Sequence, residues 1–138
     1  MKILFAASEV APFVKTGGLA DVAGSLPAAL ATHGHDVRVI LPLYSDIGEE
    51  WREQMTFVDH FHFPLSWRNS YCGLFQLRRG DVTYYFVDNE YYFKRHSLYG
   101  HFDDGERFAY FSRAVIEAPD HLDWAPDIIH CNDWQTAL

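Results

Sequence analysis

The stretch KTGGLADVAG, Lys15–Gly24, follows the first hydrophobic run of a 138-residue chain and leads directly into a helical pattern. The preceding run, KILFAA at Lys2–Ala7, is short and almost continuously apolar, as in a strand buried on both faces. Apolar residues recur at helical spacing over Leu19–His33, and Gly34 is predicted to end the helix. With DVRVIL at Asp36–Leu41 as the next strand, the order predicts a βαβ unit with a right-handed crossover.

The first helix is expected to bury one face formed by residues three or four positions apart. That face comprises Leu19, Val22, Ala23, Leu26 and Leu30. Pro27 lies inside the stretch and has no amide proton to donate, so it is expected to bend or tighten the helix.

The middle of the chain predicts antiparallel strands. Three β-type segments, MTFVDHFHFPL, YCGLFQLRRG and VTYYFVD, are separated by turns at Pro64–Asn69 and Gly80–Asp81. A helix is predicted over Asp103–Ala118, a strand over Asp127–His130, and a last helix from Asp133 or Trp134. The fold class is therefore α/β, with a Rossmann-like, mostly parallel open sheet and a β-hairpin or meander insertion.

The composition narrows the possible functions. A formal charge of −8 argues against a nucleic-acid binder, which needs a broad basic surface. No apolar run is long enough to span a membrane and no signal peptide is evident, so we expect no membrane partner and a cytoplasmic location. The cysteines, Cys72 and Cys131, have neither metal nor disulfide spacing and are expected to be free thiols.

Two polar turns are expected at one edge of the sheet. Ser8–Gly18 and His130–Trp134 each follow a strand and precede a helix, and ligands of open α/β sheets bind at that edge. Gly17 and Gly18 leave the backbone accessible and permit a positive φ, while the first amides of the helix have no helical partners. With the charge of Lys15, this turn could bind a phosphate. The spacing matches neither the Walker loop nor the dinucleotide fingerprint, so a flexible loop with a solvated lysine remains an alternative.

Other patterns have alternative interpretations. His60 and His62 alternate on a strand, but no third ligand stands at metal spacing, so no metal site is predicted. The acidic residues of FDDGE favour a helix cap over a metal site. The aromatic cluster could stack on sugars or fill the core of the sheet. It comprises Tyr84, Tyr85, Tyr91, Tyr92 and Phe93. Asp21, in the first helical turn, could stabilise the helix terminus or accept hydrogen bonds from hydroxyl groups.

Three motifs resemble one enzyme family. SEVAPFVKTGGLADVAGSLPAAL, HGHDVRVILPLY and PDIIHCNDWQTAL are similar, in this order, to segments of bacterial glycogen synthases and plant starch synthases. The resemblance covers Met1–Leu138 and implies part of the N-terminal domain of a GT-B glycosyltransferase, with the C-terminal nucleotide-binding domain absent from this chain. It implies retaining transfer of glucose from ADP-glucose to the non-reducing end of an α-1,4-glucan, without a metal or other cofactor.

The resemblance also implies roles for individual residues. Lys15, Gly17 and Gly18 are expected at the donor's diphosphate, and Asp21 at sugar hydroxyls. Tyr99 and Asp133 are expected in the cleft near the sugar, and His130 is expected to help build the turn. Many family members have a histidine where this chain has Gln135, which cannot carry a proton at neutral pH.

The resemblance places the rest of the site outside this chain. The basic pair that grips the diphosphate and most of the nucleotide pocket are expected in the second domain, so the 138 residues alone should be inactive. Because the chain stops within an apparent helix at Leu138, we expect a fragment that self-associates through its uncovered face. The alternative function is a non-catalytic glucan-binding module, which the aromatic cluster suggests.

Overall fold

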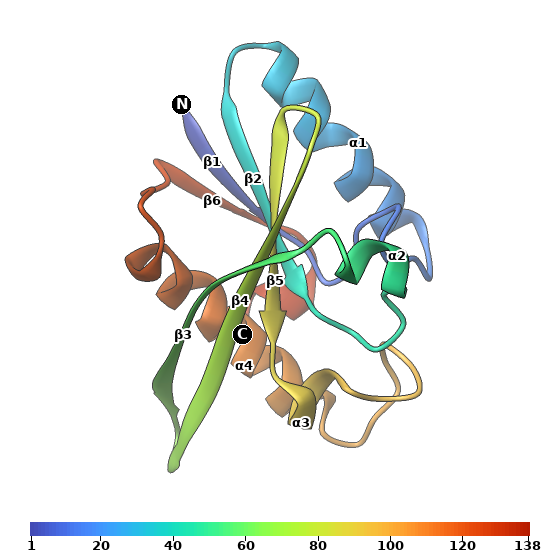
Figure 1. Ribbon diagram of the computed structural model, residues 1–138. Helices are drawn as coiled ribbons and strands as arrows, with labels where there is room; N and C mark the ends of the chain where they lie inside the picture. The colour runs from blue at the N-terminus through green and yellow to red at the C-terminus, as the bar shows by residue number, and fades with distance from the viewer.

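One six-stranded sheet with helices packed on both faces forms the protein in the computed structural model, which describes Met1–Leu138 (Figure 1). The strand order is β3-β4-β5-β2-β1-β6. The strands are β1 Lys2–Ala6, β2 Asp36–Pro42, β3 Thr56–Leu65, β4 Arg68–Arg79, β5 Val82–Asp88 and β6 Ile128–Cys131. The helices are α1 Gly18–Thr32, α2 Glu49–Arg52, α3 Glu90–Phe93 and α4 Asp104–Glu117, with the 3-10 helices η1 Ala118–His121 and η2 Trp134–Thr136. The predicted Rossmann-like α/β sheet is confirmed.

The parallel half of the sheet is built around β1. Leu4 on β1 is in register with Arg38 on β2 and with Ile129 on β6, and both pairings are parallel. β5 also pairs in parallel with β2. The chain therefore proceeds from β1 to β2 on one side and later returns to β6 on the other side. The order reverses beside β1, which makes the carboxyl ends of β1 and β6 the topological switch point of the sheet.

The antiparallel half is the predicted insertion. β3 and β4 form a hairpin in which Leu65 is in register with Arg68, so the turn is only Ser66–Trp67 and shorter than the sequence predicts. Ser66 has a φ of 56°, the left-handed conformation that tight hairpin turns need. β4 continues antiparallel to β5 around a turn with Gly80 at φ 62°. The hairpin interpretation of the middle segment is confirmed.

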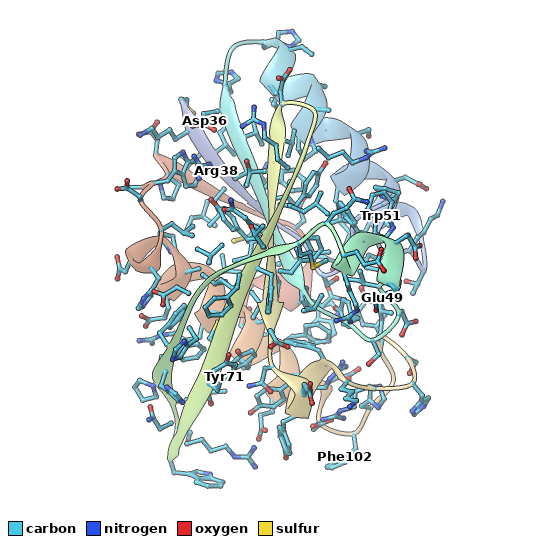
Figure 2. All side chains as sticks on the ribbon, viewed as in Figure 1. Asp36, Arg38, Glu49, Trp51, Tyr71 and Phe102 are labelled. Atoms are coloured by element: carbon cyan, nitrogen blue, oxygen red, sulfur yellow. The ribbon has the colours of Figure 1, made fainter.

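The two faces of the sheet are covered by different parts of the chain. Phe13, in the loop before α1, packs edge-on against Phe86 with ring centroids 5.2 Å apart. Tyr85 precedes Phe86 on β5 and points to the opposite face, because side chains alternate along a strand. There its hydroxyl accepts a hydrogen bond from Arg38, which stacks on Trp124 in the segment after α4 (Figure 2). The segments around α1 and α4 therefore cover opposite faces.

Helix α1 buries most of the predicted face. Ala23 is buried, and Leu26 and Leu30 are partly buried against the core, whereas Val22 is 48% exposed. Small side chains allow the preceding loop to pack directly on the helix, since a Cβ on Gly24 would lie 2.7 Å from the carbonyl oxygen of Ala11. The helix is continuous through Pro27 and ends, as predicted, before Gly34 with φ 88°. The loop therefore packs closely on a helix whose apolar face is turned toward the core.

The end of the chain differs from the predicted helix, because only the 3-10 helix η2 follows β6. Separately, no helix of the structure has the length and apolar character needed to cross a bilayer. β3 and β6 are the two edge strands, and each has a single neighbour in the sheet. Ile128 on β6 is 46% exposed. Self-association through this side of the sheet stays a prediction.

Candidate functional site

The two polar turns meet at the carboxyl ends of β1 and β6, as predicted. Asn132, which follows β6, donates to the carbonyl oxygen of Ala6 at the end of β1. Its backbone nitrogen lies 3.1 Å and its side-chain Nδ2 3.0 Å from this oxygen. The turn after β6 is thus fixed against the strand that precedes the glycine loop. This junction is the switch point where open α/β sheets bind ligands.

The loop before the glycines is packed against the rest of the fold, while the side chain of Lys15 is exposed, as the solvated-lysine alternative expects. The amide of Ala11 donates to Ala20 of α1 at 3.0 Å, and the ring of Phe13 is buried against Trp51 on α2 (Figure 2). Glu9 is 4% exposed, and its Oε2 accepts hydrogen bonds from the amide and hydroxyl of Thr16 at 2.7 and 2.6 Å. Glu9 was not among the predicted site residues, because its only signal in the sequence is an acidic residue among apolar ones after a buried strand.

The two glycines do not use the positive φ that glycine permits. Gly17 is the N-cap residue of α1 with φ −159° and ψ −163°, an extended conformation open to any residue, and Gly18 has no positive φ. Their missing side chains still matter. A Cβ on Gly18 would meet no atom within 4 Å, and no side chain caps the helix. The first amides of α1 therefore have no side-chain cap, which suits an anion.

Lys15 and Asp21 contact each other. The Nζ of Lys15 lies 2.9 and 2.8 Å from the two carboxylate oxygens of Asp21, and both side chains are more than half exposed. The sequence analysis assigned the two residues to separate contacts, with phosphate and with sugar. An exposed ion pair of this kind stabilises a protein by only about 0–1 kcal/mol, so a ligand phosphate can take the place of the carboxylate.

Tyr99 lies at the same edge. Its hydroxyl is 2.7 Å from the hydroxyl of Ser8, which is fully buried at the end of β1. Burial, together with the smaller effect of the negative charges of Glu9 and Asp133, raises the pKa of Tyr99 to about 12. Tyr99 therefore stays neutral at physiological pH and can donate or accept a hydrogen bond.

Asp133 is held in a strained backbone conformation. Its φ is 68° and its ψ 176°, a region occupied almost only by glycine, and its exposed side chain accepts a hydrogen bond from the amide of Trp134 at 2.8 Å. Such strain costs on the order of 1–3 kcal/mol and is concentrated at functional sites. No sequence pattern predicted this conformation.

Two neighbours complete this turn. His130 packs edge-on against Phe5, with ring centroids 4.8 Å apart, and its carbonyl oxygen accepts from Asn132. Gln135 is buried, and its side-chain oxygen has no hydrogen-bond partner. The backbone carbonyl oxygen of Gln135 accepts a hydrogen bond from the hydroxyl of Ser112 on α4 at 3.1 Å. His130 and Gln135 thus link the turn to the strand below it and to the helix beside it.

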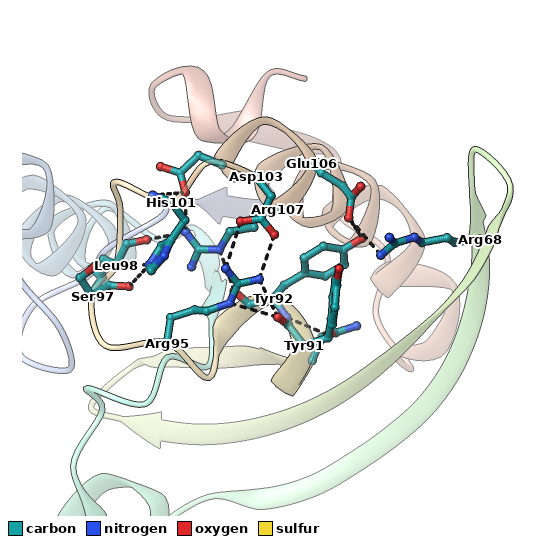
Figure 3. Close-up of polar contacts among 12 residues, drawn as sticks. Arg68, Tyr91, Tyr92, Arg95, Ser97, Leu98, His101, Asp103, Glu106 and Arg107 are labelled. Carbon is teal, nitrogen blue, oxygen red and sulfur yellow. Dashed lines mark hydrogen bonds and ion pairs between the residues drawn. The ribbon is translucent and has the colours of Figure 1, made fainter.

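The loop that carries Tyr99 is anchored by two arginines, whose roles the sequence analysis missed (Figure 3). Arg107 on α4 is fully buried, and it donates to the carbonyl oxygens of Tyr92 at 2.7 Å and Leu98 at 2.8 Å. Arg95 forms two hydrogen bonds, of 3.0 and 2.9 Å, to the carboxylate of Asp103. Together they fix both ends of the segment that presents Tyr99 to Ser8.

The predicted cap of α4 is wrong in its contacts. Asp103 occupies the N-cap position but forms no capping hydrogen bond, because its carboxylate binds Arg95 instead. Asp104 accepts from the backbone amides of Gly100 and His101 at 2.8 and 3.2 Å, and so organises the preceding loop rather than the helix. No group of three or more His, Cys, Asp or Glu side chains is arranged to hold a metal ion.

The Arg95–Asp103 ion pair predicts a pH dependence of stability. Arg95 lowers the pKa of Asp103, whose side chain is 12% exposed. A carboxyl whose pKa is lower in the folded state stabilises the fold above its unfolded pKa of about 3.9, and this contribution is lost as the pH falls through the folded value. We expect Asp103→Asn to lower the unfolding temperature at pH 6 and to reduce its fall between pH 6 and pH 3.

Thermal unfolding at several pH values checks this prediction. Asp81→Asn is the matched control, because Asp81 is exposed and forms no ion pair or side-chain hydrogen bond. Curves for the wild type and Asp103→Asn that stay parallel down to pH 3 would contradict the proposed contribution.

Most of the predicted aromatic cluster belongs to the core. Tyr84, Tyr85, Tyr92 and Phe93 are each at most 3% exposed, whereas Tyr91 is 59% exposed. The sugar-stacking alternative therefore fails for four of the five residues and remains open for Tyr91.

Comparisons with known proteins agree with this geometry. Residues 2–138 match the family model described as starch synthase catalytic domain. Proteins named glycogen synthase from Geobacillus thermodenitrificans and Desulforamulus reducens are 57% and 59% identical over all 138 residues. The chain spans 28% and 29% of their respective lengths.

A solved structure has the same fold. The catalytic domain of starch synthase IV from Arabidopsis thaliana, bound to ADP and acarbose, superimposes with a TM-score of 0.87 at 33% identity. The match covers 98% of this chain and 28% of that chain. The chain belongs to the starch synthase catalytic domain family.

Proposed function

We propose that the protein containing this chain is a glycogen synthase that transfers glucose from ADP-glucose to the non-reducing end of an α-1,4-glucan, with retention at the anomeric carbon. The observation that carries the proposal is the switch-point edge of the sheet. There an uncapped helix start at Gly17 and Gly18 and the ammonium of Lys15 lie at the same edge as Tyr99 and the strained Asp133. Relatives named glycogen synthase, and a starch synthase solved with ADP and acarbose, support this assignment.

The donor's diphosphate is the group that this edge suits best. The net charge of −8 repels anions in general, so the binding of a diphosphate must depend on a local arrangement of hydrogen-bond donors and positive charge. The uncapped amides at the start of α1 and the exposed Lys15–Asp21 pair provide such a local site. When the diphosphate binds Lys15, the carboxylate of Asp21 becomes free to accept sugar hydroxyls. The same cation stabilises the charge that develops on the leaving group.

The sugar side of the site is assigned to Tyr99 and Asp133. The neutral phenol of Tyr99 and the exposed carboxylate of Asp133 can hydrogen-bond glucose hydroxyls. His130 positions this turn through its carbonyl oxygen and its ring. We assign the remaining contacts with the nucleotide to a second domain, because the chain spans only 28–29% of the relatives' length. The 138 residues alone are expected to show no glucosyl transfer.

The test is an assay of the full-length protein with ADP-glucose and UDP-glucose against glycogen. We expect transfer from ADP-glucose, and a loss of about 10²-fold or more in kcat/KM for Lys15→Ala, as for the removal of one charge-stabilising donor from an active site. Lys2→Ala is the matched control, since Lys2 opens β1 at the opposite edge of the sheet. Equal rates for the two variants would contradict the role of Lys15.

The same assay distinguishes the proposed function from the alternative function. A non-catalytic glucan-binding module would bind glycogen but would transfer no glucose from either donor. Detection of glycogen binding without turnover in the full-length protein would favour that alternative.

A further inference from the structure

A cavity of about 430 Å³ lies between helix α1 and the turn that joins β4 to β5. β5 begins at Val82, directly after this turn, and runs parallel to β2, which in turn runs parallel to β1. The cavity is therefore at the amino edge of the sheet, opposite to the edge of the candidate site (Figure 1). Helix α1 has 15 residues and extends over roughly 22 Å from one edge toward the other. The cavity is thus separate from the proposed site of glucosyl transfer.

Small residues on α1 leave room for this cavity. Gly24, Ala28 and Thr32 line it and stand at every fourth position, so they share one side of the helix. In the turn opposite, a Cβ added to Gly80 would meet no atom within 4 Å. The space between helix and turn therefore has room for a small molecule, and its volume is within the range of small-molecule sites.

The opposite wall is formed by two side chains of the sheet. Arg79 on β4 is in register with Val82 on β5, so both point to the same face as Tyr84, two residues further along β5. The loop before α1 covers this face, because the rings of Tyr84 and Phe13 pack edge-on with centroids 4.9 Å apart. Arg79 and Tyr84 thus line the cavity together.

These two side chains offer hydrogen-bond donors to a ligand. Tyr84 is 3% exposed, and no side chain other than that of Arg79 interacts with its hydroxyl. Burial raises the pKa of Tyr84, whereas the positive charge of Arg79 and its hydrogen bond lower it. Because a guanidinium can only donate, the phenol accepts from Arg79 and keeps its own proton for a ligand. Arg79 is exposed and forms no ion pair, so its charge is available as well.

The groups around Arg79 determine how a ligand can be oriented. Asp81 is an exposed carboxylate without an ion pair, and the last turn of α1 at Thr32 carries the negative end of the helix dipole. Both disfavour an anion except directly at Arg79. Both suit hydroxyl groups, since the carboxylate of Asp81 accepts hydrogen bonds and the Thr32 hydroxyl, which donates to the carbonyl oxygen of Ala29 at 2.6 Å, retains a free lone pair.

We propose that this cavity, lined by Arg79, Tyr84, Thr32 and Asp81, binds a small phosphorylated sugar. The guanidinium fork of Arg79 and the phenol of Tyr84 provide three donors, which match the three terminal oxygens of a phosphate better than the two of a carboxylate. The sugar hydroxyls then bond Thr32 and Asp81. The inference does not rest on the proposed function, because neither the ligand nor the edge of the sheet is that of the transfer reaction.

The experiment is isothermal titration calorimetry of the full-length protein with glucose 6-phosphate. We expect Arg79→Ala to weaken binding by about tenfold or more, which corresponds to about 1.4 kcal/mol. Tyr84→Phe, which removes only the hydroxyl, is expected to weaken it by about threefold. Arg78→Ala is the matched control, because it removes the same charge from a neighbour whose side chain points to the other face of the sheet.

A second variant tests the cavity without changing any charge. Ala28→Leu fills the space from an exposed position on α1 and leaves Arg79 in place. We expect it to weaken the binding of glucose 6-phosphate as strongly as Arg79→Ala does.

The ligand and the location of its site are checked in the same titrations. Lys15→Ala is expected to bind glucose 6-phosphate like the wild type, and glucose and inorganic phosphate are each expected to bind the wild type about tenfold or more weakly than glucose 6-phosphate does. An absence of binding to the wild type, or equal affinities of Arg79→Ala and Arg78→Ala, would overturn the proposal. So would binding that is lost in Lys15→Ala but kept in Ala28→Leu, or inorganic phosphate that binds as tightly as the sugar phosphate.

Discussion

Replacing Arg107 by alanine is expected to destabilise the protein by about 3–5 kcal/mol, the largest stability effect of any substitution considered for this fold. Arg107 is fully buried and satisfies two backbone carbonyls, those of Tyr92 and Leu98, as well as the carboxylate of Asp104 at 2.9 Å. Truncation removes the side-chain donor from both carbonyl oxygens and the cation beside Asp104, and unpaired buried polar groups are costly. Arg107→Lys is expected to recover only part of the loss, because an ammonium cannot reproduce the planar fork of the guanidinium.

The measurement is thermal or urea unfolding of the full-length protein. Arg113→Ala is the control on the same helix, since Arg113 is 45% exposed and pairs only with Glu117, four residues on. That surface pair is worth about 0–1 kcal/mol. If Arg107→Ala were no more destabilising than Arg113→Ala, the anchoring role of Arg107 would be wrong.

Arg107 affects the candidate site because it anchors the segment that carries Tyr99. The segment between Tyr92 and Asp104 has little regular structure, and its position depends on the contacts of Arg107 and Arg95. Loosening it separates the hydroxyl of Tyr99 from Ser8. The helix therefore contributes to the site although no residue of it was predicted to.

Those parts of the fold that depend on local patterns could be predicted from the sequence. The apolar run of β1 and the alternation in the middle strands predicted the parallel half and the hairpin, because the burial of a strand determines which of its positions are apolar. The buried residues of α4 include Phe108, Phe111 and Val115, which likewise recur at helical spacing. The buried face of α1 could largely be predicted from its apolar spacing, but the close approach of the loop at Ala11 to Gly24 could not, since it depends on the preceding segment.

The candidate site was predictable at the level of position but not of contacts. The rule that ligands bind beyond the carboxyl ends of parallel strands places both turns correctly. The Lys15–Asp21 pair was missed because the two residues lie on opposite sides of a helix start, where helical spacing does not apply. Arg107 was missed because a charged residue inside an amphipathic pattern is ordinarily read as solvated, and its buried partners are backbone carbonyls that no sequence pattern marks.

Substitutions of Asp133 are expected to move stability and activity in opposite directions. Asp133→Gly relieves the backbone strain at φ 68° and should raise the stability by about 1 kcal/mol or more. Asp133→Ala keeps the strain and also loses the hydrogen bond to the amide of Trp134, so it should be less stable than the wild type. Both changes remove the carboxylate from the sugar side of the site, where we expect a loss of about 10²-fold or more in kcat.

Asp133→Asn separates charge from geometry. The amide side chain can still accept from Trp134 and leaves the strained turn in place, so its stability should stay near that of the wild type while its kcat falls with the loss of charge. Unfolding temperatures and rates with ADP-glucose and glycogen, measured on the full-length protein, test the series. A glycine variant less stable than the alanine variant would refute the strain, and an asparagine variant with the wild-type rate would refute the role of the charge. If the glycine variant is the more stable and the asparagine variant loses activity, the strained conformation at Asp133 serves function. The protein then retains it because only that conformation aims the carboxylate at the substrate, as expected where function and local stability conflict.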